Sequence, residues 1–105
     1  MSYLVVFARD PVDDALADAI LARVRELGDA GWFDDPGADT PAERTTGGYV
    51  RTDDPEAPHA VALVDAARAL SAEHGCTFEV QFREVAIAHV AEGERRAAPS
   101  GEPPR

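Results

Sequence analysis

The sequence of 105 residues predicts a single α+β domain with the element order β-α-β-β-α-β. Two observations support this prediction. The apolar run Leu4–Ala8 passes directly into a helical pattern that ends at Leu27. A second helical pattern, which ends at His74, passes directly into a segment of alternating apolar and polar residues. Two short segments between the helical patterns have the composition of strands, which completes the order.

The first strand and helix are predicted from the stretch Tyr3–Leu27. Its apolar run does not alternate, which is typical of a central strand that is covered on both faces. Asp10 is expected to cap the helix, and Pro11 suits the first helical position because that position needs no N–H donor. Gly28 then ends the helix. Apolar residues recur every three or four positions and form one stripe: Val12, Leu16, Ala19, Ile20, Val24 and Leu27.

Two short strands and a long loop are predicted between the helices. The segment Gly31–Asp34 contains two adjacent aromatic residues and is followed by the turn sequence Asp35-Pro36-Gly37. The polar stretch 38–48 has no period and is interpreted as a loop. The second strand is expected at residues 49–52, where it can pair with the first as a hairpin.

The second helix and the strand after it have clear start and stop signals. Asp54 and Pro55 repeat the pattern of an acidic cap followed by proline at the first helical position. Gly75 ends the helix. Residues 76–83 then alternate, as in a strand that is buried on one side. The residues expected to point inward are Phe78, Val80 and Phe82.

The segment Glu84–Ala91 fits two interpretations. The alternation can continue through it as a further strand, but its alanines, with Glu84 at the start and Gly93 after the end, favour a short helix. Residues 94–105 are rich in charged residues, proline and glycine, and are predicted to be a disordered tail. The folded domain is therefore expected to cover residues 1–93.

The element order is that of the ferredoxin-like fold, in which two helices pack on one face of a four-stranded antiparallel sheet. The strands around Val5 and Val80 are expected to be neighbours in the middle, with the two short strands at the edges. The other sheet face would stay open for a dimer contact or a ligand. If Leu4, Val6 and Ala8 pointed toward it, they would form an exposed apolar patch. The alternative is a small open α/β sheet in which the segment after the first helix is not a strand.

The net charge of −10 limits the classes of partner. The chain has no lysine, and clustered Lys and Arg are what nucleic acids and anionic membranes require, so we expect binding to neither. Most of the net charge lies in the first half of the chain. It has two explanations: an acidic face that docks on a basic partner or mimics nucleic acid, or the composition of a high-GC bacterium, with ten arginines and twenty alanines.

The single cysteine, Cys76, excludes an internal disulfide framework and fits a reducing, cytoplasmic location. No apolar run approaches the length of about 18 residues that a membrane span requires. The N-terminus has no basic region followed by an apolar stretch, so no export signal is predicted.

No metal, cofactor or catalytic residue is predicted. His74 and Cys76 can supply two zinc ligands, but His59 lies at the other end of the same helix, about 22 Å away, so it cannot join them in one site. Cys76 follows a helix C-terminus, whereas reactive thiols favour helix N-termini. Six acids can gather around a hard cation, but their spacing is not that of an EF-hand loop. These acids are Asp34, Asp35, Asp39, Glu43, Asp53 and Asp54.

The best candidate for a binding site is the irregular stretch between the two helices. Aromatic residues and arginines, which dominate interface hot spots, flank its loop. The expected site residues are Trp32, Phe33, Asp34, Asp35, Arg44, Tyr49 and Arg51. In the alternative interpretation, Trp32 and Phe33 cap the core beneath the first helix.

These observations lead to two hypotheses for the function. The first is a protein-interaction or regulatory domain without enzymatic activity, with an inhibitor or immunity-type protein that blocks a basic target as its specific version. The second is a small-molecule-binding domain or cofactor-free enzyme, built as a ferredoxin-like dimer with a pocket between sheet and helices.

Overall fold

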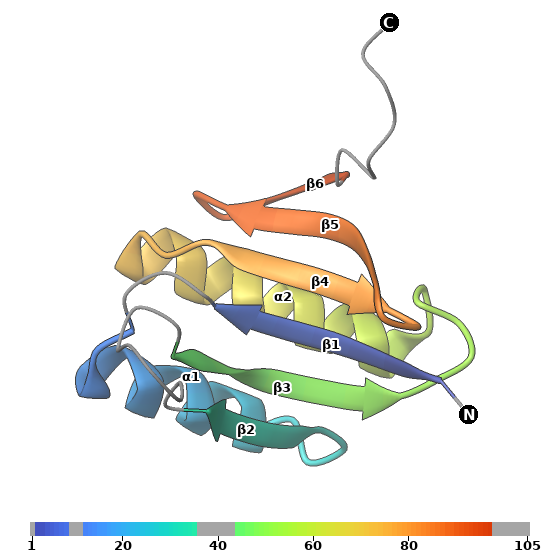
Figure 1. Cartoon of the computed structure of the whole chain (residues 1–105), viewed down its shortest axis with the longest axis horizontal. Coiled ribbons are helices and arrows are strands. Elements are labelled where there is room, and N and C mark those ends of the chain that lie inside the picture. Colours follow the sequence, from blue (N-terminus) through green and yellow to red (C-terminus); the bar gives the residue numbers. More distant parts are fainter. Residues whose placement is uncertain (1, 9–11, 36–43, 98–105) are drawn as a thin grey trace, which may run out of the picture.

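The computed structural model describes residues 2–8, 12–35 and 44–97. In this part of the chain, six strands form one antiparallel sheet, and two helices pack on one of its faces (Figure 1). The helices are α1 (Asp14–Arg25) and α2 (Pro58–His74). The strands are β1 (Tyr3–Ala8), β2 (Gly31–Asp35), β3 (Thr45–Arg51), β4 (Phe78–Phe82), β5 (Val85–Ala91) and β6 (Glu94–Ala97).

The predicted α+β class is confirmed, and so is the placement of β1 and β4 as neighbours in the middle of the sheet. The strand order is β2-β3-β1-β4-β5-β6. With six strands instead of four, the sheet as a whole does not match the predicted ferredoxin-like order. β2 lies at an edge as expected, whereas β3 is paired on both sides, with β1 and β2.

The prediction of a short helix over Glu84–Ala91 is wrong, because β5 occupies Val85–Ala91. A two-residue turn returns the chain onto β4, and Ala88 and Val90 then pair with Val80 and Phe78 on the buried face. Tertiary pairing thus overrides the helix preference of the alanines. The chain turns once more, and residues 94–97, placed in a disordered tail by the sequence, form β6. Residues 98–105 lie outside the described residues.

Both helices begin later than predicted. The amide of Leu16 donates to the Asp13 carboxylate at 2.8 Å, so Asp13 caps α1, while Asp10 and Pro11 lie outside the described residues. Asp54 accepts from the amide of Glu56 at 2.9 Å and forms a turn, and Pro58 instead of Pro55 takes the first position of α2. The stop predicted at Gly75 is confirmed by its left-handed backbone, with φ of 70°.

Strand β3 begins at Thr45, inside the stretch predicted to be a loop. Gly48 faces α1, where an added Cβ would come within 2.7 Å of Val24 Cγ1. Glycine here allows the helix to approach the sheet closely, and it does not mark a turn. The predicted hairpin pairing of this strand with β2 is confirmed.

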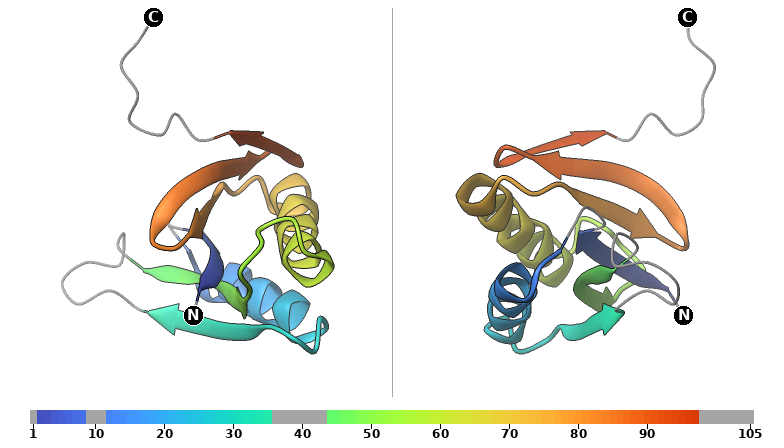
Figure 2. Two further views of the ribbon diagram at one scale, coloured as in Figure 1. Left: turned by 90° about the vertical axis from the view of Figure 1, so that its right-hand side faces the viewer. Right: turned by 60° about the vertical axis from the view of Figure 1, so that its left-hand side comes forward.

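The core fills the space between the sheet and the helices. Leu4, Val6 and Ala8 of β1 point into it and are almost fully buried, so these residues do not form an apolar patch on the open face. Their neighbours Tyr3 and Val5 point the other way. We call this second side, which the helices do not cover, the outer face (Figure 2).

Hydrogen bonds of one buried hydroxyl connect the β5–β6 hairpin to α2. Ser71 is 1% exposed, and its Oγ accepts from the amide of Gly93 at 2.8 Å while donating to the carbonyl of Arg68 at 2.9 Å. The Arg68 guanidinium donates to the carbonyl of Gly93 at 3.1 Å. The hairpin turn is thus bonded on both its amide and its carbonyl.

Replacing Ser71 with alanine should lower the free energy of unfolding by about 1–2 kcal/mol, because the Gly93 amide loses its partner in a partly buried place. Urea denaturation followed by circular dichroism measures this change. Thr77→Ala, which removes a hydroxyl at an exposed position, is the matched control and should change stability little. Equal effects of the two substitutions would contradict the proposed anchoring role.

Candidate functional site

The seven predicted site residues are divided between the two faces of the sheet. Side chains alternate along the strands, so Trp32 and Asp34 lie on the helix face. Phe33 and Asp35 lie on the outer face, together with Tyr49 and Arg51 of β3. Trp32 is 50% exposed beside α1, with the guanidinium carbon of Arg25 at 5.1 Å from its ring centre. The structure therefore does not bring all of them into one surface patch.

Arg44 is committed to contacts within the chain. Its guanidinium donates to both carboxylate oxygens of Asp34, at 3.0 and 2.9 Å, and to a carboxylate oxygen of Asp14 at 2.9 Å. A further hydrogen bond of 3.2 Å reaches the carbonyl of Val12. With only 18% of its side chain exposed, Arg44 joins the β2–β3 hairpin to the start of α1. It is therefore poorly available to a partner.

The same contacts shift two ionisation equilibria. Hydrogen bonds from the Arg44 guanidinium lower the pKa of Asp34; partial burial opposes this change, and the Thr46 hydroxyl, which donates at 2.8 Å, adds to it. The hydrogen bonds to Asp34 and Asp14 raise the pKa of Arg44. Both groups are therefore charged at neutral pH.

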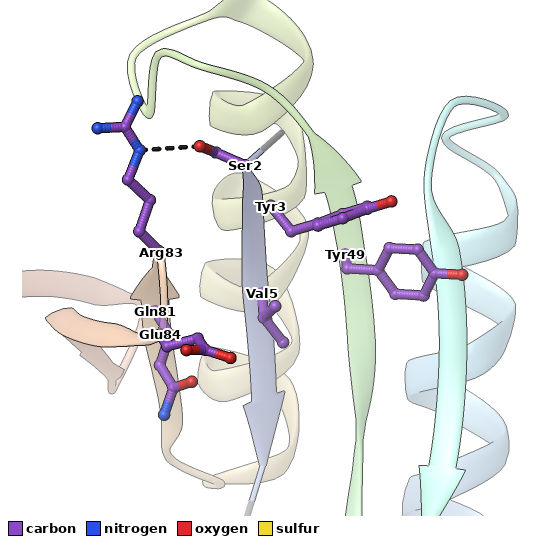
Figure 3. A pocket seen from close by; sticks show the side chains of 7 residues that line it. All are labelled: Ser2, Tyr3, Val5, Tyr49, Gln81, Arg83 and Glu84. Atoms are coloured by element: carbon purple, nitrogen blue, oxygen red, sulfur yellow. Dashed lines mark hydrogen bonds between the residues drawn. The ribbon is translucent and has the colours of Figure 1, made fainter.

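The outer face carries a hollow of about 740 Å³ (Figure 3). Tyr3 and Tyr49 form one side of it, with ring centres 5.8 Å apart in an edge-to-face arrangement. Gly31 leaves room for the Tyr49 ring, which occupies the place of a side chain at that position. The residues that line this outer-face hollow are Ser2, Tyr3, Val5, Tyr49, Gln81, Arg83 and Glu84.

The charged side of the hollow is a strained turn. Arg83 and Glu84 connect β4 to β5 with φ of 53° and 68°, a region that glycine and asparagine normally occupy in two-residue hairpin turns. Arg83 is held there, because its Nε donates to Ser2 Oγ at 2.8 Å and its amide donates to the carbonyl of Tyr3 at 3.3 Å. Glu92 and Gly93 adopt the same region in the β5–β6 turn, with φ of 55° and 79°, so this is the backbone of a two-residue hairpin turn, at some steric cost to Arg83 and Glu84.

Sequence reasoning identified only Tyr49 among the residues that line the hollow. Tyr3 and Val5 alternate with the buried residues of β1, but the run is apolar throughout, so neither face could be recognised as exposed. The turn could not be recognised either, because Arg83-Glu84 lacks the Asn-Gly or Asp-Gly signature.

The described residues contain no group of three or more His, Cys, Asp and Glu side chains that could hold a metal ion. Of the acids considered as cation ligands, Asp39 and Glu43 lie outside the described residues. Cys76 is buried, with its sulfur 3.9 Å from the carbonyl of Leu70. Within the described ranges, no helix is both long and apolar enough to span a membrane.

Comparisons of the chain with protein families, with curated proteins and with solved structures find no match.

Replacing Asp34 with asparagine should destabilise the protein in a pH-dependent way. The pKa of Asp34 is lower in the folded chain, so its stabilising contribution is complete above the unfolded value near pH 4 and is lost as the pH falls through the folded value. The difference in unfolding free energy between wild type and Asp34→Asn should thus be largest near neutral pH and shrink below about pH 4.

Urea denaturation at several pH values measures this difference. Asp18→Asn, at an exposed position of α1, controls for the loss of one negative charge. In an Arg44→Ala background the effect of Asp34→Asn should become smaller, because the main cause of the shift is removed. A difference that is independent of pH would contradict this account.

Replacing Glu84 with glycine should stabilise the chain by about 1 kcal/mol, because glycine adopts a positive φ without the steric cost that other residues incur. Ala86→Gly, within β5, should be destabilising and serves as the control. Thermal and urea unfolding measure both changes. The measurement uses dilute chain, so that association does not contribute, and a loss of stability in Glu84→Gly would then show that the turn is not strained.

Proposed function

We propose that the chain is a protein-interaction domain that binds a basic partner through the exposed acids of α1 and the turn after it. These residues, the α1 acidic patch, are Asp18, Glu26 and Asp29. A blocking role, as in an inhibitor or immunity-type protein, is the specific form of this proposal. Like charges on such a surface accelerate encounter with a basic target and make it sensitive to salt.

The observation that carries the proposal is the placement of the arginines. Arg23 pairs with Glu73, Arg68 with Asp65, and Arg44 with Asp34 and Asp14. Arg95 and Arg96 likewise pair with Glu56 and Glu94. These five arginines lie beside acids. Arg25, which lies on α1 between Asp18 and Glu26, instead places its guanidinium over the Trp32 ring. The three acids of the α1 acidic patch outnumber this cation, which supports attraction of a basic surface.

A second candidate is small-molecule binding, which the volume of the outer-face hollow favours, since ligand pockets commonly measure about 300–1,000 Å³. A pocket between sheet and helices has less support. The cavity found there measures about 10 Å³ and is lined only by apolar side chains and Gly47, too small for more than one water molecule.

We also infer that the first four strands and the two helices form a ferredoxin-like unit, which the β5–β6 hairpin extends. The partial order β2-β3-β1-β4, with both helices on one side, supports this assignment. A reducing, cytoplasmic setting fits its single cysteine.

The proposal is tested by capturing the partner on immobilised chain, identifying it and measuring its association rate with purified variants. Asp18→Asn/Glu26→Gln should slow association about tenfold and reduce its dependence on salt between about 0.05 and 0.5 M. Asp53→Asn/Glu92→Gln removes the same charge elsewhere and should change the rate much less. Equal rates for the two variants, or a partner without a basic surface, would contradict the proposal.

A further inference from the structure

We propose that two copies of the chain associate face to face through their outer faces, with the tyrosine pair of each copy packed at the hollow of the other. This inference concerns the side of the sheet opposite the helices, so it does not depend on the proposed role of the α1 acidic patch. Aromatic exposure, charge balance and the fixed geometry of the Arg83-Glu84 turn support it.

The aromatic side chains provide the apolar centre of the contact. Tyr3 and Tyr49 are 44% and 38% exposed in the middle of the sheet, and Val5 lies half-buried beside them. Within the described residues both helices lie on the opposite side (Figure 2). Tyrosine offers a large contact area with little conformational freedom to lose, and it is enriched at the centres of interfaces.

The distribution of charge on the outer face favours a second copy of the chain as its partner. The whole chain has a net charge of −10, so most pairs of identical surfaces on two copies would repel each other. The outer-face hollow, in contrast, is lined by one cation and one anion, Arg83 and Glu84. A two-fold contact brings the same patch of both copies together, and therefore requires a patch that complements itself. A basic partner would instead favour an acidic surface.

The turn makes reciprocal pairing possible. Arg83 and Glu84 are adjacent, so a two-fold axis near the turn can place Arg83 of each copy opposite Glu84 of the other. Figure 3 shows the polar side chains on one side of Val5 and the two tyrosine rings on the other. The guanidinium lies 4.9 Å from the ring centre of Phe82 and is bonded to Ser2, so little of its freedom remains to be lost on binding.

The dimer leaves both helices of each copy on its outside, because they lie on the far side of the sheet. Each copy would therefore keep its α1 acidic patch accessible. Two such patches on one particle would let a partner with two basic sites bind with increased avidity.

The test is the mass of the full chain in solution, measured by sedimentation velocity over a range of concentrations. The sedimenting species of the wild-type chain should have twice the chain mass of 11.2 kDa. Arg83→Glu and Glu84→Arg should each weaken association at least tenfold, since each places like charges opposite one another. An equal mixture of the two variants should restore the dimer, because the turn of one chain then carries two glutamates and faces two arginines at the turn of the other.

Two further variants keep the test decisive if either charge variant fails to fold, which circular dichroism detects. Tyr49→Ala should weaken association at least tenfold. Trp32→Ala removes an aromatic residue of comparable exposure from the helix face and should leave the dimer intact. A wild-type chain that stays monomeric at high concentration, or equal effects of these two substitutions, would overturn the inference and leave the hollow to a small molecule or another protein. Neither result would bear on the α1 acidic patch, which is tested with its own variants.

Discussion

The structure depends on the pairing of β1 with β3 on one side and β4 on the other. The β1 residues Leu4 and Val6, which alternate along the strand, are buried against the helices, and this fixes the side on which α1 and α2 pack. The residues that alternate with them, Val5 and Phe7, point away from the helices. Phe7 is buried within the chain, whereas Val5 is half-buried at the outer-face hollow. A contact at the hollow would cover the part of this face that stays exposed.

The two faces also differ in electrostatic character. On the helix side, Arg44 joins Asp34 and Asp14 and thereby closes the β2–β3 hairpin onto α1. On the outer side, one arginine and one glutamate lie at a turn whose backbone is held in an unfavourable region. The outer-face hollow is thus lined by one charge of each sign, whereas the α1 acidic patch has three acids, and we assign the two surfaces to different partners for this reason.

The sequence allowed the fold class and the central strands to be predicted, because hydrophobic pattern and stop signals agree around β1, α1, α2 and β4. It could not distinguish strand from helix at Glu84–Ala91, since alanine favours the helix and only pairing with β4 decides otherwise. The sequence predicts a loop at Gly48, because the packing role of this glycine depends on Val24, which is distant in the sequence. The outer-face hollow was missed for a similar reason: Tyr3, Tyr49 and Arg83 meet only after three strands pair.

We propose that the outer face is a contact surface of a different kind from the acidic helix side. Backbone amide NMR spectra recorded along a dilution series test this proposal most directly. We expect concentration-dependent shifts at Tyr3, Tyr49 and Gln81, with the amides of Asp18 and Glu26 unchanged until a basic partner is added. Shifts that centre on α1 during dilution, or spectra that do not change with concentration, would contradict the claim.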